Sequence, residues 1–264
     1  MKIAIITSSN YGSAAHHLPQ LIQSACCEIS IVIVSDNHIT NKKRHYQKKL
    51  KKVWEIGFLG TLNGFRMRKW YDQDVKKYTQ INHLEETCQQ NGISYHKVST
   101  VNCQQTQDLI KKSGADVGIS LGNGYIWKKI FNSFPLGMIN IHHEELPKYQ
   151  NASSIIWQIY NGSTHTGYTI HKIDSKIDTG EVLYQEQIPI IFKETLADTV
   201  SNSFASILDH SAKGLIHVIK NFQSLYDNAK PQGIGSSYTT PTFWQYIKIY
   251  RQFKNLKKNI RLGK

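Results

Sequence analysis

Short apolar runs alternate with segments of helical periodicity through the first half of the chain. An apolar run of about four to eight residues between polar turns is typical of a buried strand. Strands separated by helices predict βαβ units, in which the strands lie parallel and the crossovers are right-handed. The predicted strands are residues 2–8, 28–37, 93–99, 115–122 and 138–142, and the predicted helical segments are 14–25, 82–91, 105–114 and 128–132.

The pattern changes after Asn151. Two segments, 164–174 and 181–190, alternate apolar and polar residues as antiparallel strands do. Asn82 and Thr195 each have an acidic residue three positions on, which predicts a helix N-cap at both. Helices are therefore expected over 152–160, from Thr195 to Phe222, and over a basic closing segment whose apolar side is Phe243, Ile247, Tyr250, Phe253, Leu256 and Ile260.

These elements predict an α/β fold with a mostly parallel sheet and helices on both of its faces. An antiparallel extension and a small C-terminal helical appendage complete it. We expect residues 1–192 to form the main unit, and residues 193–264 to supply the long helix, a loop and the basic C-terminal helix. Residues 40–74 fit poorly in a βαβ repeat and predict a basic helical insert, with breaks at Gly57, Gly60 and Gly64.

Composition indicates a globular protein of the cytoplasm. Of the 264 residues, 40% are hydrophobic, and no apolar run reaches the roughly 18–20 residues that span a bilayer. The N-terminal segment lacks the long apolar region of a signal peptide and is expected to be the first strand. The four cysteines have no C-x-x-C spacing, so no zinc site is expected.

The formal net charge of +13 predicts a polyanionic partner, which could be a nucleic acid, an anionic membrane or a phosphorylated small molecule. The basic residues cluster in the insert and in the C-terminal helix. The simplest interpretation of both clusters is a solvated helix face. The apolar side of the C-terminal helix could pack on the long helix, on a second subunit in a homodimer, or as a peripheral contact on an anionic membrane.

The predicted strand 138–142 ends in polar residues. Asn140 and His142 lie two apart, so both side chains point to the same face at the carboxyl end of the strand. Ligands gather at this edge of a parallel sheet. A second polar segment, 174–180, follows another apolar strand and could return to the same place. An amide, an imidazole and a carboxylate together suit acyl transfer by direct attack of the substrate, since no nucleophile elbow is present.

Several short motifs then resemble those of formyltransferases that use 10-formyltetrahydrofolate. They are N-x-H at 140–142, L-P-K-Y at 146–149, Trp157, N-G at 161–162, T-G-Y-T-I-H at 166–171 and D-T-G at 178–180. The resemblance implies an enzyme with a Rossmann-like catalytic domain over 1–192, no metal, and 10-formyltetrahydrofolate as the formyl donor.

Roles carried over from this family stay tied to the matching positions. Asn140 would hydrogen-bond the formyl oxygen, His142 would stabilise the tetrahedral oxyanion, and Asp178 would orient His142 or a water and accept the proton of the attacking amine. The folate would lie against the loops matching 121–127 and 174–180. The expected folate-binding residues are Leu121, Gly124, Tyr125, Ile126, Asp174 and Thr179.

The resemblance does not identify the amine that accepts the formyl group. The chain departs from the usual family residues at Glu144, Glu145, Asn151 and Ser154, which border the acceptor pocket. His143 is expected to be structural or to face the rim of the site, and the two glutamates are expected either to be solvated or to contact the acceptor. Length favours a nucleotide-linked amino sugar for glycan synthesis (dTDP- or GDP-linked), as in lipopolysaccharide or capsule building. The alternatives are methionyl-tRNA, glycinamide ribonucleotide, or a non-catalytic folate-fold binding protein, with nucleic acid the less expected partner.

Overall fold

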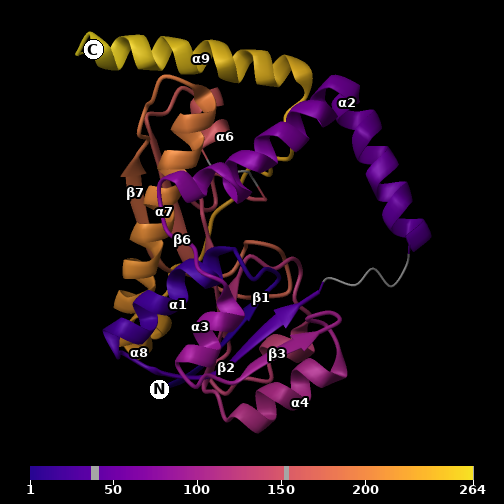
Figure 1. The fold of residues 1–264 in the computed structure, drawn as a ribbon, viewed down its shortest axis with the longest axis vertical. Coiled ribbons are helices and arrows are strands. Elements are labelled where there is room, and N and C mark those ends of the chain that lie inside the picture. The colour runs from indigo at the N-terminus through magenta and orange to yellow at the C-terminus, as the bar shows by residue number, and fades with distance from the viewer. Residues whose placement is uncertain (37–41, 152–154, 264) are drawn as a thin grey trace.

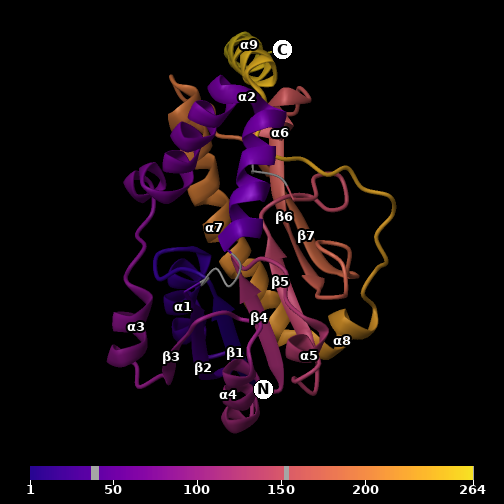
Figure 2. The same ribbon diagram turned by 90° about the vertical axis from the view of Figure 1, so that its right-hand side faces the viewer.

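A computed structural model describes residues 1–36, 42–151 and 155–263. The fold is a seven-stranded sheet in the order β3-β2-β1-β4-β5-β6-β7. The first five strands along the chain pair in parallel, and β6 and β7 add an antiparallel hairpin beside β5. The predicted fold class is confirmed (Figures 1 and 2). The strands are β1 (Lys2–Thr7), β2 (Glu28–Ser35), β3 (Tyr95–Val98), β4 (Val117–Leu121), β5 (Met138–His142), β6 (His165–Lys172) and β7 (Val182–Pro189).

Helices cover both faces of the sheet (Figure 2). Alternate side chains of β1 show this, since Ile3 and Ile5 pack into one core with α1, α3 and α7, whereas Ala4 and Ile6 pack into another with α4 and α5. The helices are α1 (Ser13–Ser24), α2 (Lys42–Asp72), the 3₁₀ turn η1 (Asp74–Lys77), α3 (Leu84–Gln90), α4 (Gln104–Ser113), α5 (Lys128–Phe131), α6 (Ile156–Tyr160), α7 (Leu196–Lys220), α8 (Phe222–Asp227) and α9 (Phe243–Arg261).

The two predicted helix caps have different outcomes. Thr195 caps α7 as predicted, because its hydroxyl accepts a hydrogen bond from the Asp198 backbone N–H at 3.0 Å. The cap predicted at Asn82 is wrong, because His83 is the N-cap of α3 and the Asn82 side chain accepts from Gln80 instead. The predicted helix start at 152–154 lies outside the described residues.

The basic insert forms α2, which projects from the body and bends at its middle (Figure 1). The break predicted at Gly57 is confirmed, since this residue has φ 76° and ψ 165° inside the helix. The breaks predicted at Gly60 and Gly64 are wrong. Both are helical, and their missing side chains let α2 approach the segment before α9: a Cβ at Gly60 would lie 3.3 Å from the Pro241 carbonyl oxygen, and one at Gly64 would lie 2.9 Å from Thr240.

The terminal helix α9 lies across α6 and α2, at the end of the molecule remote from α4 (Figure 1). Its buried residues are Ile249 and Phe253. The predicted apolar side is therefore only partly correct, since Phe253 is buried but Tyr250 and Ile260 are exposed. Within the described residues, no helix is long and apolar enough to cross a membrane. The domain boundary at residue 192 stays a prediction.

Candidate active site

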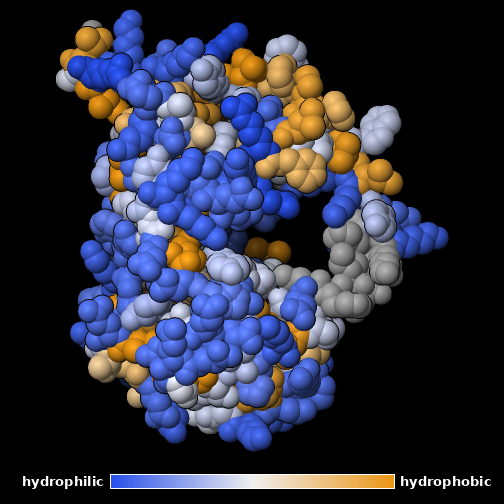
Figure 3. Space-filling model, viewed as in Figure 1, coloured by the Kyte–Doolittle hydropathy of each residue, from blue (hydrophilic) through white to orange (hydrophobic). Residues whose placement is uncertain are grey.

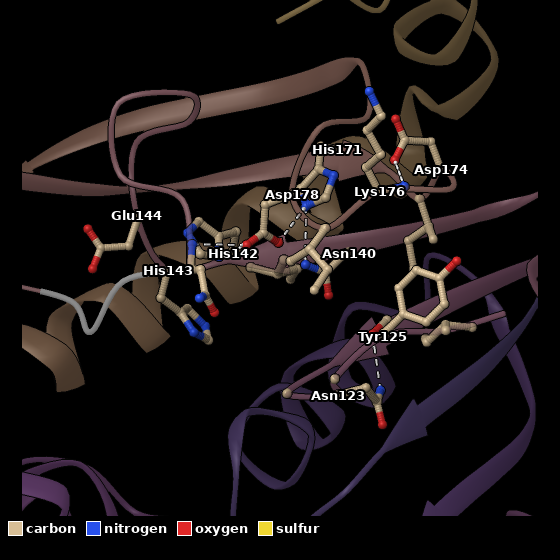
Figure 4. Close-up of a pocket in the computed structure, with 18 of the residues that line it drawn as sticks. Asn123, Tyr125, Asn140, His142, His143, Glu144, His171, Asp174, Lys176 and Asp178 are labelled. Carbon is tan, nitrogen blue, oxygen red and sulfur yellow. Dashed lines mark hydrogen bonds and ion pairs between the residues drawn. The ribbon is translucent and has the colours of Figure 1, made fainter. Parts of the chain in front are cut away.

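A cavity of about 400 Å³ opens at the carboxyl ends of β4 and β5 (Figure 4). Its walls come from the loop after β4, the end of β5, the turn between β6 and β7, and single residues of α2 and α7. Such a volume falls in the range of small-molecule sites. Seven of the nine predicted site residues line it: Gly124, Tyr125, Ile126, Asn140, His142, Asp174 and Asp178.

The other two predicted residues do not line the cavity. The Leu121 side chain is fully buried in the sheet core, and a contact of its backbone with folate stays a prediction. The Thr179 hydroxyl donates to both carboxylate oxygens of Asp174 at 2.9 Å. Asp174 also accepts the Lys176 backbone N–H at 2.9 Å. Asp174 and Thr179 therefore shape the turn between β6 and β7, as aspartates and threonines commonly do.

Asn140, His142 and Asp178 meet at one end of this cavity (Figure 4). The Asp178 carboxylate lies 3.7 Å from His142 Nδ1. It is placed by a left-handed backbone (φ 55°) and by the Asn151 backbone N–H, which donates to it at 3.2 Å. Asn151 itself has a left-handed backbone, with φ 52°, which asparagine tolerates better than most residues. The sequence thus brings an amide, an imidazole and a carboxylate together from two separate segments.

The hydrogen bonds of His142 fix its tautomer. Its Nε2 lies 2.8 Å from the Tyr149 carbonyl oxygen, which can only accept, so Nε2 carries a hydrogen. The other nitrogen, Nδ1, faces Asp178. A proton taken up at Nδ1 would therefore form an ion pair with Asp178, which is the arrangement that favours a histidine able to hold and release a proton.

His171 is a site residue that sequence reasoning did not assign. Its Nδ1 donates to the Lys172 carbonyl oxygen at 2.8 Å, which leaves Nε2 free to accept from the Asn140 amide at 3.2 Å. Burial lowers the pKa of His171, so the imidazole stays neutral and keeps this acceptor. The pairing of β6 with β5 places His171 opposite Asn140. This strand pairing is the feature that could have indicated His171 as a site residue.

The D-T-G glycine has a steric reason. Gly180 packs so closely on the Lys172 backbone that a Cβ would overlap the Lys172 carbonyl. On the opposite wall, the Tyr125 hydroxyl donates to the Ser175 carbonyl oxygen at 3.2 Å. This bond ties the loop after β4 to the turn between β6 and β7, so the two predicted folate-binding loops form one continuous rim.

Of the two residues that follow the motif, Glu144 is buried and His143 is half-buried. Glu144 is 1% exposed, so the expectation that it is solvated is wrong. Its side chain accepts a hydrogen bond from Gln158, and burial raises its pKa well above the usual range. His143 lines the cavity wall beside Phe204, and burial lowers its pKa to about 3. Glu145 lies nearer the surface and accepts from Gln187 at 3.0 Å.

Tyr71 and Phe204 also line the cavity and were missed from the sequence. They come from α2 and α7, two elements outside the sheet, and nothing in their local sequence indicates that they reach its edge. Among the residues that the structure describes, no group of three or more histidine, cysteine, aspartate or glutamate side chains is arranged to hold a metal ion.

Comparison with known proteins now bears on this site. A model of the formyl transferase family matches residues 1–219. The chain belongs to this family. The methionyl-tRNA formyltransferase of Buchnera aphidicola is 36% identical over 129 residues, which cover 48% of this chain and 39% of that protein. That of Syntrophus aciditrophicus is 38% identical over 105 residues, 38% of this chain and 34% of that protein. The match therefore spans well under half the length of either curated relative.

Solved structures of formyltransferases share the fold at low sequence identity. The phosphoribosylglycinamide formyltransferase of Bacillus halodurans has a TM-score of 0.58 and 16% identity, covering 85% of this chain and 96% of that one. An N-formyltransferase from Helicobacter canadensis has a TM-score of 0.51 and 18% identity, covering 96% of this chain and 80% of that one. Both confirm the architecture, and neither identifies the acceptor.

Proposed function

We propose that this protein transfers a formyl group from 10-formyltetrahydrofolate to the amine of a nucleotide-linked sugar. The observation that carries the proposal is the convergence of Asn140, His142 and Asp178 at one end of a cavity of small-molecule size. Asn140 is held by His171, and His142 is held by the Tyr149 carbonyl, so both groups are positioned before any substrate arrives.

The chemistry follows from these positions. A neutral amine attacks the formyl carbon, because a protonated amine has no free lone pair. The C=O bond electrons move to the oxygen, where the second N–H of the Asn140 amide and a protonated His142 stabilise the developing negative charge. Asp178 accepts the proton released by the amine, directly or through a water, and the protonated His142 donates its proton to the donor nitrogen as the bond from that nitrogen to the formyl carbon breaks. The proton on Asp178 then passes to His142, which restores both groups. The products are an N-formyl amine and tetrahydrofolate.

The residues present fit a folate donor. The Asn123 side chain lines the cavity, and its Oδ1 is buried without a hydrogen-bond partner. Its Nδ2 donates to the Ile6 carbonyl oxygen at 2.7 Å and to Ser120 at 3.0 Å, which orients Oδ1. A buried acceptor without a partner is costly and suits an N–H donor of a bound ring. The rim tied by Tyr125 would flank that ring.

The sugar acceptor rests on chain coverage among the solved structures. The Helicobacter canadensis enzyme, whose structure holds folinic acid and dTDP-3-aminofucose, covers 96% of this chain. A sugar N-formyltransferase from Shewanella sp. also covers 96%, against 85% for the Bacillus halodurans enzyme. Methionyl-tRNA is the second candidate acceptor, because the curated relatives act on it by name and because the chain is strongly basic.

A mass-resolved acceptor screen tests the proposal. The full chain is incubated with 10-formyltetrahydrofolate and either a panel of amino-sugar nucleotides or methionyl-tRNA. The true acceptor gains one formyl group in place of one hydrogen, and the others keep their mass. Formylation of methionyl-tRNA alone would replace the sugar by the second candidate, and no formylation of any amine would refute the activity.

Variants of the cavity separate chemistry from folding. We expect Asn140→Ala and His142→Ala each to lower turnover by about two orders of magnitude, the usual effect of losing an oxyanion donor. His165→Ala is the matched control, because His165 is exposed at the far end of β6. Near-wild-type turnover of either cavity variant would refute the assigned roles.

A further inference from the structure

The helix α2 exposes large apolar side chains that a protein normally buries. Trp54 is 89% exposed, Phe58 72% and Phe65 65%. We call the α2 apolar face the set of Leu50, Trp54, Phe58, Leu62 and Phe65, all of which are exposed. Gly57 breaks the helix between Trp54 and Phe58, so the set has one part on each arm. A spacing of four residues places Leu50 and Trp54 on one side of the first arm, and spacings of four and three residues place Phe58, Leu62 and Phe65 on one side of the second arm. In the space-filling view, hydrophobic residues gather at the end of the molecule where α2 bends (Figure 3).

The second arm of α2 is anchored, so this exposure belongs to the folded state. Met67 and Trp70 are buried in the main core, and Gly60 and Gly64 approach the segment before α9. The helix therefore has an inner side that packs and an outer side that does not. An exposed apolar face of this kind marks an interaction surface.

The distribution of charged residues indicates which kind of partner the α2 apolar face binds. The helices α2 and α9 together carry 16 basic and 2 acidic residues, and the rest of the chain carries 16 basic and 17 acidic ones. All of the net positive charge therefore lies in these two helices, which pack against each other. Exposed lysines adjoin the apolar face on its first arm: Lys48, Lys49, Lys51 and Lys52.

We infer that the α2 apolar face docks on an anionic lipid bilayer, with the lysines of α2 and the basic residues of α9 meeting the headgroups. A helix with aromatic and leucine side chains on one side and lysines beside them is the pattern of an interfacial membrane contact. Anionic headgroups also complement the charge. The inference goes beyond the proposed formyl transfer and does not depend on it.

Other occupants fit less well. A second copy in a symmetric dimer would bring the same lysine-rich surfaces together, and like charges in contact are unfavourable. Single-stranded or structured RNA would use the basic residues and the aromatic rings, but it offers little to Leu50 and Leu62. A bilayer accepts the leucines, the aromatic rings and the lysines at once.

Docking of α2 would also set the position of the cavity relative to the membrane. Phe65 of the apolar face and Tyr71 of the cavity wall are six residues apart in the same helix, about 9 Å along its axis. The membrane surface would then lie beside the site. An acceptor used in glycan assembly at a membrane would be delivered there.

Vesicle flotation tests the inference with the full chain and no substrate. Vesicles of phosphatidylcholine alone are compared with vesicles that also contain phosphatidylglycerol. We expect binding only to the anionic vesicles. The triple variant Trp54→Ser, Phe58→Ser and Phe65→Ser should weaken binding more than tenfold, because buried aromatic area is lost. Its matched control is Ile234→Ser, since Ile234 is fully exposed in the loop before α9.

A variant with altered surface charge gives a second test of membrane binding, because it replaces only exposed residues. Replacing Lys48, Lys49, Lys51 and Lys52 by glutamine should also weaken binding more than tenfold, whereas Lys111→Gln with Lys112→Gln on α4 should not. Circular dichroism melting checks that every variant is folded. The inference is overturned by a wild type that does not bind anionic vesicles, or by a folded aromatic variant that binds as well as the wild type. It is also overturned if light scattering shows a dimer that the aromatic variant abolishes, or if RNA binds the wild type and the aromatic variant loses that binding.

Discussion

The half-buried imidazole of His143 predicts a specific dependence of stability on pH. His143 lines the cavity wall against Phe204, and burial lowers its pKa to about 3 from 6.5, with a further lowering by His142 and His16 nearby. Below pH 6.5 the imidazole of His143 is therefore protonated in the unfolded chain but stays neutral in the folded protein. For a base whose pKa is lowered by folding, stability is intact above the unfolded pKa and is lost as the pH falls below it.

The size of this loss follows from the two pKa values. At about pH 5 the unfolded imidazole is almost fully protonated and the folded one is almost fully neutral. Each pH unit below 6.5 then costs about 1.4 kcal/mol, so some 1.5 units remove about 2 kcal/mol of the unfolding free energy. The result holds as long as the folded pKa is below about 4, because His143 is then neutral throughout this range.

A difference between two proteins isolates the effect, because buried groups titrate too. Burial lowers the pKa of His17 and His171 in the same direction, and it raises the pKa of Glu144, which stabilises the folded state as the pH falls. The contributions of His171 and Glu144 are present in the wild type and in a His143→Leu variant alike. Because His143 also lowers the pKa of His17, subtracting the two proteins leaves the contribution of His143 together with its coupling to His17.

Urea unfolding at about pH 7 and about pH 5 gives the four free energies that are needed. The wild type should lose about 2 kcal/mol more than His143→Leu between the two pH values. A His165→Leu variant, in which an exposed histidine is replaced, should keep the wild-type pH dependence. Equal pH dependence in the wild type and His143→Leu would refute the assignment of a neutral, half-buried imidazole.

Three further predictions concern the site and the fold. Asp178→Asn should lower turnover more than folate affinity, because it keeps the turn but removes the charge facing His142; a variant that keeps its rate and loses affinity tenfold would contradict this. Dialysis against a chelator should leave activity intact, and inactivation reversed by zinc or magnesium would contradict a metal-free mechanism. Gly214→Ala should lower the unfolding free energy, measured by urea titration, by about 1–3 kcal/mol. Alanine favours helices, but a Cβ at this position would collide with the Tyr168 hydroxyl. Unchanged stability would contradict that packing.

The sheet was predictable because its strands are short and buried on both faces. In the sequence such strands are recognised as apolar runs. Their alternation with helices is compatible with only a few sheet topologies. The hairpin 164–190 was predictable from its alternation of apolar and polar residues. Helix ends were less so. Thr195 and Asn82 have the same cap pattern, but only at Thr195 does the chain before the helix place the side chain over the first turn.

The outer helices show why periodicity alone was insufficient. Ile247, Ile249 and Tyr250 give α9 apolar residues on several sides, so more than one stripe can be drawn along it. The structure buries Ile249 because α9 meets α6 and α2 on that side. Gly60 and Gly64 likewise looked like helix breakers until their partner, the segment before α9, was known. Each outcome depends on a contact between segments far apart in the sequence.

The same distinction divides the cavity into two parts. Asn140, His142 and Asp178 come from the sheet and its turns, where the register of β5 with β6 sets their spacing, and the sequence motifs were sufficient to predict them. Tyr71 and Phe204 come from α2 and α7, which are positioned only by tertiary packing. A reaction common to a family needs the first part, and an acceptor particular to one protein is selected by the second. Tyr71 and Phe204, which sequence reasoning missed, belong to this second part, whereas His171, also missed, belongs to the sheet. Tyr71 also joins the cavity to α2, the helix whose apolar face is exposed.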